Sequence, residues 1–296
     1  MNILISGASG LIGKAIRDYS QKNGHKILSL QRKNPAITPY WNIEKQIVAI
    51  EQNDKIDAVI HLAGESIAEG RWNHNKKERI LKSRIDGTKL LSEYFSKVEH
   101  KPKVFISCSA IGYYGHREEE NLTEKSKEGT GFLSNVCQEW EKATAIAVQA
   151  EIRVVNIRLG MVLSGDGGAL KKMILPFKIG LGGIIGNGKQ YISWVTIHDI
   201  ANAINHIIEN QKIEGPVNIV TPNPVTNYDF TKILGKVLHR PTMLPLPALM
   251  AKIIFGEMAE ELLLSSTKVT PEKLINSGFK FQYPELENAI ISCLTS

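Results

Sequence analysis

A glycine-rich turn within the first thirteen residues constrains the fold more than any other feature of the chain. Residues 7–13 read Gly-Ala-Ser-Gly-Leu-Ile-Gly, directly after an apolar run at residues 2–6 and directly before a run of helical period. A strand-to-helix turn needs glycine where φ is positive, where backbone approaches phosphate, and where helix packs on strand. Free N–H groups at the start of the helix then bind a pyrophosphate. The turn predicts a dinucleotide site formed by Gly7, Ser9, Gly10, Leu11, Ile12 and Gly13.

Short β-branched apolar runs alternate with longer helical segments, which is the pattern of a parallel sheet. Residues 80–97 and 132–149 have the spacing of helices. His61 lies inside a predicted strand and is expected to be a core histidine with satisfied hydrogen bonds. The fold class is α/β, a Rossmann-type doubly wound parallel sheet. Its predicted strands are residues 2–6, 26–30, 58–62, 103–107, 154–159 and 217–219.

The composition changes twice in the second half of the chain. Nine glycines lie between residues 160 and 188, which favours loops over a site. After Leu-Pro-Leu-Pro at 244–247 the chain reads as apolar helices. We therefore divide it into a dinucleotide-binding Rossmann domain (1–164), a smaller substrate-side lobe interwoven with the sheet (165–243) and a C-terminal helical cap (244–296).

Charge and cysteine content exclude several classes of protein. The three cysteines are too few for a disulfide framework, and no Cys/His cluster indicates a metal site. The net charge of +6 is scattered along the chain, which favours an anionic small-molecule substrate over nucleic acid. The sequence shows neither a signal peptide nor a run of about 18 uninterrupted apolar residues. We expect a cytoplasmic protein without nucleic-acid or membrane partners, and leave a homodimer open.

Basic residues at the end of the second predicted strand bear on which dinucleotide binds. An NAD site usually places Asp or Glu there, about twenty residues after the glycines, to accept the ribose 2′-OH. This chain has Gln31-Arg32-Lys33 instead, and a guanidinium suits a 2′-phosphate. The pattern favours NADP(H). The alternative is that Arg32 and Lys33 are solvated loop charges.

Ordered motifs along nearly the whole chain resemble the extended short-chain dehydrogenase/reductases. They are most similar to an atypical, NAD-dependent epimerase/dehydratase-like epimerase family with a C-terminal helical extension. The motifs are the glycine turn, residues 61–65 (His-Leu-Ala-Gly-Glu), 107–115 (Ser-Cys-Ser-Ala-Ile-Gly-Tyr-Tyr-Gly), 158–163, 193–199 and 256–264. Further cofactor positions are then expected at Asn42, Leu62, Ala63, Gly64, Glu65, Arg84, Ser107 and Arg158. Two of these have alternatives, since Arg84 could be a surface charge and Arg158 a structural salt-bridge partner.

The resemblance also implies a catalytic Ser, Tyr and Lys, of which only one is present. Ser109 matches the Ser, whereas the Tyr and Lys of the YxxxK motif fall on Leu133 and Cys137. Tyr113 or Tyr114, on the loop after Ser109, could supply the missing hydroxyl, or could simply pack a turn. Cys137 could donate the proton if a helix N-terminus or Arg84 lowered its pKa, or could be buried and inert.

Two functions follow from this incomplete set. In the first, the protein catalyses NADP-dependent oxidoreduction or epimerisation of a small carbonyl or sugar-like substrate, with Ser109 holding the carbonyl oxygen. In the second, it binds NADPH without turnover and reports redox state to a partner. The missing Lys favours the second function, and the retained Ser109 favours the first.

Overall fold

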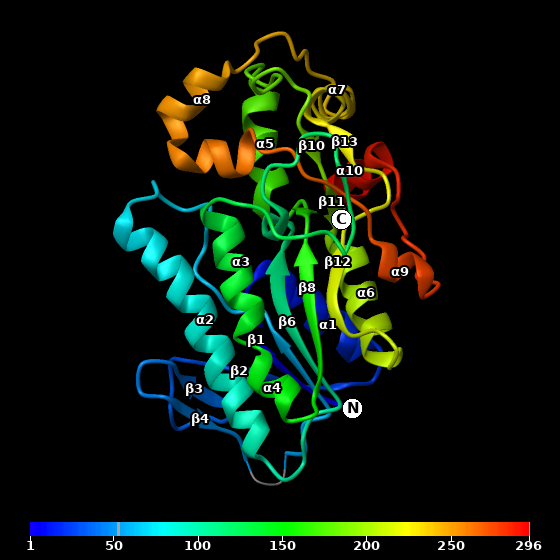
Figure 1. Ribbon diagram of the computed structural model, residues 1–296. Helices are drawn as coiled ribbons and strands as arrows, with labels where there is room; N and C mark the ends of the chain where they lie inside the picture. The colour runs from blue at the N-terminus through cyan, green and yellow to red at the C-terminus, as the bar shows by residue number, and fades with distance from the viewer. Residues whose placement is uncertain (52–53, 296) are drawn as a thin grey trace.

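A six-stranded parallel sheet forms the centre of the molecule (Figure 1). The computed structural model describes residues 1–51 and 54–295. All five strand pairings are parallel, as the fold class predicted. In spatial order the strands are β12 (Gly215–Ile219), β8 (Arg153–Leu159), β6 (Val104–Ala110), β5 (Ala58–His61), β1 (Asn2–Ser6) and β2 (Lys26–Leu30). Each predicted strand is present, with β6 longer at its carboxyl end.

Helices cover both faces of this sheet. Along β1, Ile3 and Ile5 pack into one core with residues of α1 (Leu11–Lys22) and α6 (Ile197–Glu209). Leu4 packs into the opposite core with α2 (His74–Lys97). The alternation follows from the period of two in a strand that is buried on both faces.

Two of the predicted helices differ from those found. The expected helix over 132–149 is two helices, α3 (Phe132–Lys142) and α4 (Ala145–Gln149). The expected helix over 80–97 begins earlier, because the Asn73 side chain accepts a hydrogen bond from the Lys76 N–H and caps α2. The glycine-rich stretch predicted as loops contains α5 (Gly168–Lys178), which begins after Gly167.

The remaining elements build a lobe beyond the carboxyl ends of the strands (Figure 1). Leu163, Trp194, Phe230 and Ile290 belong to its separate apolar core. The helices after α6 are α7 (Asn227–Val237), α8 (Ala248–Phe255), the π-helix Ala259–Leu263, α9 (Glu272–Asn276) and α10 (Leu286–Thr295). The chain after residue 244 packs on this lobe through α10, which lies beside α7, and reaches the edge of the central sheet through α9, which lies beside β12.

Short strand pairs and a 3₁₀ turn complete the fold. The turn, Ile111–Tyr114, follows β6 directly. The pairs are β3 (Tyr40–Asn42) with β4 (Ile47–Ala49), β7 (Asn121–Leu122) with β14 (Lys268–Val269), β9 (Met161–Leu163) with β11 (Trp194–Thr196), and β10 (Tyr191–Ile192) with β13 (Val225–Thr226).

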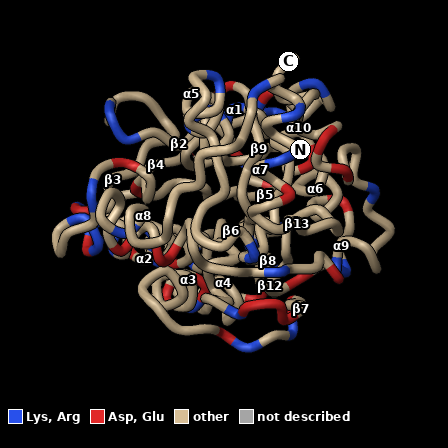
Figure 2. Tube along the Cα trace, turned by 90° about the horizontal axis from the view of Figure 1, so that it is seen from above, with Lys and Arg blue, Asp and Glu red and all other residues tan. Residues whose placement is uncertain are grey.

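Acidic and basic residues are interleaved around the molecule, without a single long stripe of one sign (Figure 2). None of the helices in the described part of the chain is both long and apolar enough to span a bilayer.

Candidate functional site

The carboxyl ends of β1, β5 and β6 bring polar side chains into one row. Ser6, His61 and Ser107 are register partners across these three strands. The Ser6 hydroxyl lies 2.6 Å from His61 Nδ1 and also accepts hydrogen bonds from the N–H groups of Leu62 and Ala63. His61 Nε2 has no partner among the described residues, so the expectation of a satisfied core histidine is only half correct. Complete burial lowers the pKa of His61 to about 3.

The glycine turn has the geometry that a bound pyrophosphate requires. Gly7 has a φ of +74° and lies so near Ala63 that a Cβ would stand 3.0 Å from the Ala63 nitrogen. A Cβ on Gly13 would lie 2.3 Å from the Gly7 oxygen, so only glycine lets α1 pack this close. At Gly10 a Cβ would meet only the Gly7 oxygen, at 3.3 Å, which leaves the outer side of the turn open.

The first turn of α1 is left free to bind an anion. Its N-cap is Gly10, and no side chain in the described part of the chain caps it. The first turn also carries no acidic residue, so its N–H dipoles face solvent without competition. Ser9 is exposed on the same turn. These residues fit a dinucleotide.

Arg32 and Lys33 are exposed just beyond β2, at the edge of the sheet next to β1. Within residues 1–51 and 54–295, neither has a carboxylate partner. A free guanidinium without an adjacent acid is what a 2′-phosphate needs. The NADP(H) assignment of this position therefore fits the structure.

Asn42 has a local role that the sequence did not reveal. Its side-chain oxygen accepts a hydrogen bond from the Lys45 N–H at 2.8 Å, which closes the turn between β3 and β4. Its amide nitrogen lies 3.4 Å from the Tyr40 hydroxyl. Contact with an adenine would have to compete with these bonds, so the expected cofactor role of Asn42 is not supported.

The segment after β5 passes over Arg84. The Arg84 guanidinium donates to the carbonyls of Glu65 and Ile80, both at 3.0 Å, and a Cβ on Gly64 would lie 3.3 Å from its Cζ. It also stacks 4.9 Å from the centre of the Trp140 ring. Burial lowers the pKa of Arg84, so its interpretation as an ordinary surface charge is wrong.

Two other expected cofactor positions in this region are engaged elsewhere. The Glu65 carboxylate pairs with Lys76 at 2.7 Å, and this hydrogen bond lowers the pKa of Glu65. Ser107 is fully buried within the sheet. A side chain enclosed between neighbouring strands cannot reach a ligand on the loops, so the expectation for Ser107 is wrong.

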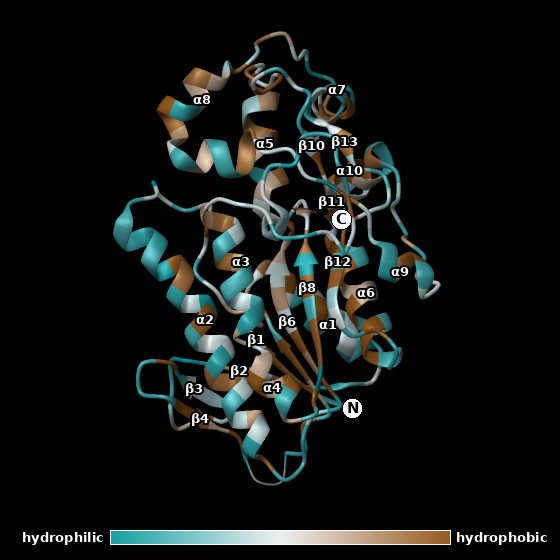
Figure 3. Ribbon diagram, in the orientation of Figure 1, coloured by the Kyte–Doolittle hydropathy of each residue, from teal (hydrophilic) through white to brown (hydrophobic). Residues whose placement is uncertain are grey.

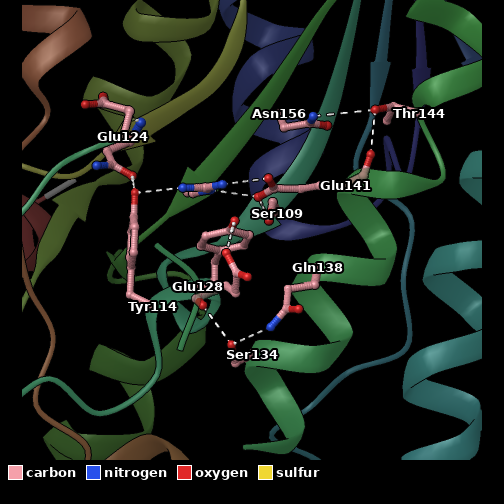
Figure 4. A network of polar contacts seen from close by, with 12 residues as sticks. Ser109, Tyr114, Glu124, Glu128, Ser134, Gln138, Glu141, Thr144 and Asn156 are labelled. Atoms are coloured by element: carbon pink, nitrogen blue, oxygen red, sulfur yellow. Dashed lines mark hydrogen bonds and ion pairs between the residues drawn. The ribbon is translucent and has the colours of Figure 1, made fainter. Parts of the chain in front are cut away.

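A chain of polar contacts crosses the carboxyl ends of β6, β8 and β12 (Figure 4). The Ser109 hydroxyl donates to Glu141 Oε1 at 2.7 Å. Arg158 donates to both Glu141 oxygens, from Nε at 2.8 Å and from Nη2 at 2.7 Å. Arg158 Nη1 donates to the Tyr114 hydroxyl at 2.9 Å, which donates to Asn218 Oδ1 at 2.7 Å. Each polar group in this series is matched by the next.

This network corrects the expectations for Arg158 and Tyr114. Arg158 is the buried salt-bridge partner of Glu141, which was the alternative to a cofactor ligand. Tyr114 is fully buried, and burial raises its pKa to about 12. Tyr113 lies against the Arg158 guanidinium, 3.4 Å from Cζ to the ring centre, and burial raises its pKa as well. Tyr114 therefore packs the turn and is not poised to donate a proton. The half-buried Tyr113 donates its hydroxyl proton to Glu128 at 3.3 Å, so a catalytic role for Tyr113 stays a prediction.

Cys137 is also unsuited to proton donation. It lies on the buried face of α3, and burial raises its pKa to about 11, opposite to the expected direction. Arg84 offsets only part of this effect. The thiol therefore stays neutral at physiological pH, as in the buried and inert alternative.

The Ser109 hydroxyl donates a hydrogen bond to Glu141, a contact that the sequence did not indicate. Its proton is committed to Glu141, so toward a ligand Ser109 offers an oxygen that accepts. Holding a carbonyl oxygen would require Ser109 to donate, which it can do only when Glu141 is protonated, so that expectation stays a prediction. Sequence reasoning missed Glu141, although it lies four residues after Cys137 on the same face of α3.

A second missed carboxylate closes the other end of α3. Glu261, in the C-terminal extension, accepts hydrogen bonds from the N–H groups of Phe132 at 3.1 Å and Leu133 at 3.2 Å. The N-cap residue Gly131 has no side chain of its own for this purpose. A residue about 130 positions away in sequence therefore caps the helix.

Across residues 1–51 and 54–295, no cluster of three or more His, Cys, Asp or Glu side chains is arranged to hold a metal ion.

Comparison with known proteins gives matches over the full chain. A model of the NAD dependent epimerase/dehydratase family matches residues 3–220, and a model of a domain of unknown function (DUF1731) matches residues 246–292. The epimerase family protein ML0860 of Mycobacterium leprae is 37% identical over 290 residues, which cover 97% of this chain and 94% of that protein.

Two solved structures are similar over nearly all of this chain. The crystal structure of human epimerase family protein SDR39U1 (isoform 2) with NADPH has a TM-score of 0.92, with 31% identity over 100% of both chains. The nucleoside-diphosphate sugar epimerase of Corynebacterium glutamicum has a TM-score of 0.82 and 36% identity over 99% of this chain and 58% of that chain.

Proposed function

Because the chain belongs to the NAD dependent epimerase/dehydratase family, we propose that it binds NADP(H) at the glycine turn and uses it in an oxidoreduction. The observation that carries the cofactor assignment is the turn itself, where Gly7, Gly10 and Gly13 leave an uncapped helix N-terminus open to a pyrophosphate. The human relative solved with NADPH supports the same assignment.

Three groups of this chain would hold the cofactor. The N–H groups at the start of α1 bind the pyrophosphate, and the backbone of Leu62 and Ala63 borders the turn after β5. Arg32 pairs with the 2′-phosphate. When bound, NADP(H) supplies hydride transfer at its nicotinamide.

Ser109 and Glu141 would move the proton that accompanies this hydride. A substrate hydroxyl can donate to Ser109 Oγ, because the Ser109 proton already points at Glu141. When the substrate O–H proton passes to Ser109 Oγ, the Ser109 proton passes to the Glu141 carboxylate. Loss of this proton from oxygen, together with loss of a hydride from the carbinol carbon to the oxidised cofactor, would convert an alcohol to a carbonyl, and the reverse sequence would protonate the carbonyl oxygen as hydride is added to carbon. Arg158 orients the carboxylate through two hydrogen bonds.

In this relay Ser109, Glu141 and Arg158 would take the place of the missing Tyr and Lys. The substrate would be a small carbonyl or sugar-like alcohol, in line with the sequence expectation. The three cysteines are free, which suits the reducing, cytoplasmic compartment that we also propose.

The burial of the relay favours a second candidate function. Ser109 is only 1% exposed, and Cys137 beside it is also buried. A protein that binds NADPH without turnover, and changes a partner-binding surface as it does so, needs no accessible Ser109. An opening of the lobe on cofactor or substrate binding would favour the enzyme instead.

Isothermal titration of NADPH and NADH tests the cofactor assignment. We expect Arg32→Ala to weaken NADPH binding about 10- to 100-fold and to leave NADH binding unchanged, because one charge-assisted contact to the 2′-phosphate is lost. Lys212→Ala, an exposed cation at the opposite edge of the sheet, is the control and should change neither affinity. Equal losses for both dinucleotides would place the 2′-phosphate elsewhere.

The two functions are separated by measuring the loss of NADPH absorbance during incubation with a panel of carbonyl and sugar-nucleotide compounds. If a substrate is turned over, Glu141→Gln should abolish turnover while NADPH affinity stays within about two-fold. If no compound is turned over and NADPH alone alters protection of the lobe from hydrogen exchange, the sensor is favoured. Full turnover by Glu141→Gln would exclude the relay.

A further inference from the structure

Exposed apolar side chains gather at one end of the molecule, on a surface that we call the crown. It consists of residues 175–181, residues 239–244 and α8, and carries half of the exposed large apolar side chains of the described residues. Met243 is 82% exposed and Leu249 69%. Figure 3 shows the hydrophobic colour on α8 and α5 at this end. Monomeric soluble proteins rarely expose so large an apolar patch unless it forms an interaction surface.

One side-chain and two backbone hydrogen bonds hold the three parts of the crown together. Arg240 Nε donates to the carbonyl of Lys178 at 3.0 Å, which ties residues 239–244 to the end of α5. The N–H of Leu246 donates to the carbonyl of Ile184, and the N–H of Gly186 donates back to Leu246. Since α8 begins two residues after Leu246, the apolar side chains lie on one connected surface.

The crown is also basic. Its three parts contain Lys178, Arg240 and Lys252 and no Asp or Glu. Within the described residues, Lys178 and Arg240 have no carboxylate partner. Lys252 pairs with Glu260 at 2.6 Å.

Of the three acidic residues that follow α8, Glu260 neutralises one crown cation, Lys252, and the other two are engaged outside the crown. Glu257 pairs with Lys77 at 2.7 Å, Glu260 pairs with Lys252, and Glu261 caps α3. Unpaired cations beside exposed aliphatic side chains form the combination that binds at the interface of an anionic bilayer.

We propose that the crown binds the surface of an anionic lipid membrane, peripherally and reversibly. A second copy of the chain fits less well, because an isologous contact would bring the same unpaired cations close together. The expectation of no membrane partner rested on the absence of a spanning segment and on scattered charge along the sequence. The crown arises only when folding brings three segments together.

Flotation of the full-length protein with vesicles tests this proposal. We expect binding to phosphatidylcholine vesicles that contain phosphatidylglycerol, and none to phosphatidylcholine alone. The double variant Lys178→Glu/Arg240→Glu should reduce the bound fraction at least ~10-fold, as should Met243→Ser/Leu249→Ser. Val148→Ser, which removes an exposed apolar side chain on α4, is the control and should bind as the parent does.

Three outcomes would overturn the proposal. The first is no binding to either vesicle. The second is equal binding to both vesicles that charge reversal leaves unchanged. The third is a dimer in solution that Met243→Ser/Leu249→Ser converts to a monomer, without any vesicle binding. NADPH affinity, measured on each variant, verifies that the nucleotide domain is folded and is independent of the crown.

Discussion

Removing one partner of the Glu141–Arg158 ion pair should destabilise the protein far more than removing both. The Arg158 side chain is 3% exposed and that of Glu141 12%, and two ionic hydrogen bonds join them. Glu141→Leu leaves a buried guanidinium without its carboxylate, which costs about 3–5 kcal/mol of unfolding free energy. Arg158→Met leaves the buried carboxylate alone and should cost a similar amount.

The double variant Glu141→Leu/Arg158→Met contains no buried charge at this site. Only the hydroxyls of Ser109 and Tyr114 lose a partner, at roughly 1 kcal/mol each, so a net loss near 2 kcal/mol is expected. The entropy of unfolding of a chain this long is about 0.6 kcal/mol per kelvin. Each single variant should therefore lower Tm by about 5–8 °C, and the double variant by about 3 °C.

Urea denaturation followed by circular dichroism measures these losses, and the four proteins form a double-mutant cycle. The reasoning predicts a coupling free energy of at least about 4 kcal/mol between the two residues. Additive losses in the double variant would refute it, because they would mean that the two side chains act independently.

Three further predictions concern single side chains. Glu261→Gln should lower the unfolding free energy by about 1 kcal/mol in urea denaturation, because it weakens the cap of α3, whereas the matched Glu260→Gln should lower it by less than about 0.5 kcal/mol. Cys137 should react with iodoacetamide far more slowly than a free thiol at pH 8, by mass spectrometry of the folded protein, because burial raises its pKa to about 11; rapid labelling would contradict this. His61 has a pKa of about 3 when folded and about 6.5 when unfolded, so the unfolded chain binds an extra proton between these values. Stability should be complete above pH 6.5 and fall by about 1.4 kcal/mol per unit as pH drops toward 3, a slope that His61→Gln should lack in urea denaturation.

Local features of the sequence predicted the nucleotide-binding half of the molecule well. The turn at residues 7–13 and the six strands depend on interactions between residues close together in sequence, so short stretches of sequence are enough to predict them. The prediction of loops where the structure has α5 was wrong for a local reason too. Gly165, Gly167 and Gly168 crowd just before the helix and at its first residue, so composition averaged over the region hid a helical run that starts there.

The candidate active site was less predictable because its contacts depend on strand order. Ser109, Arg158 and Asn218 come from β6, β8 and β12, which are neighbours only because the sheet has the order β12-β8-β6. The direction of the Cys137 pKa was wrong for a related reason. The helix N-terminus expected to stabilise a thiolate is closed by Glu261, which lies far along the chain.

The two missed carboxylates lie where α3 lacks the Tyr and Lys of the superfamily pattern. Those residues would lie at Leu133 and Cys137, in the first two turns of the helix. Here Glu261 accepts hydrogen bonds from N–H groups of the first turn, and Cys137 in the second turn is buried. The charged group facing Ser109 is Glu141, one turn later, with Arg158 as its cation. In the relay that we propose, the cation comes from the sheet and acts on a carboxylate, whereas in the superfamily pattern it comes from the helix and acts on a phenol. The proposed relay would accept a proton from an alcohol in its resting state, and would first have to be protonated to reduce a carbonyl.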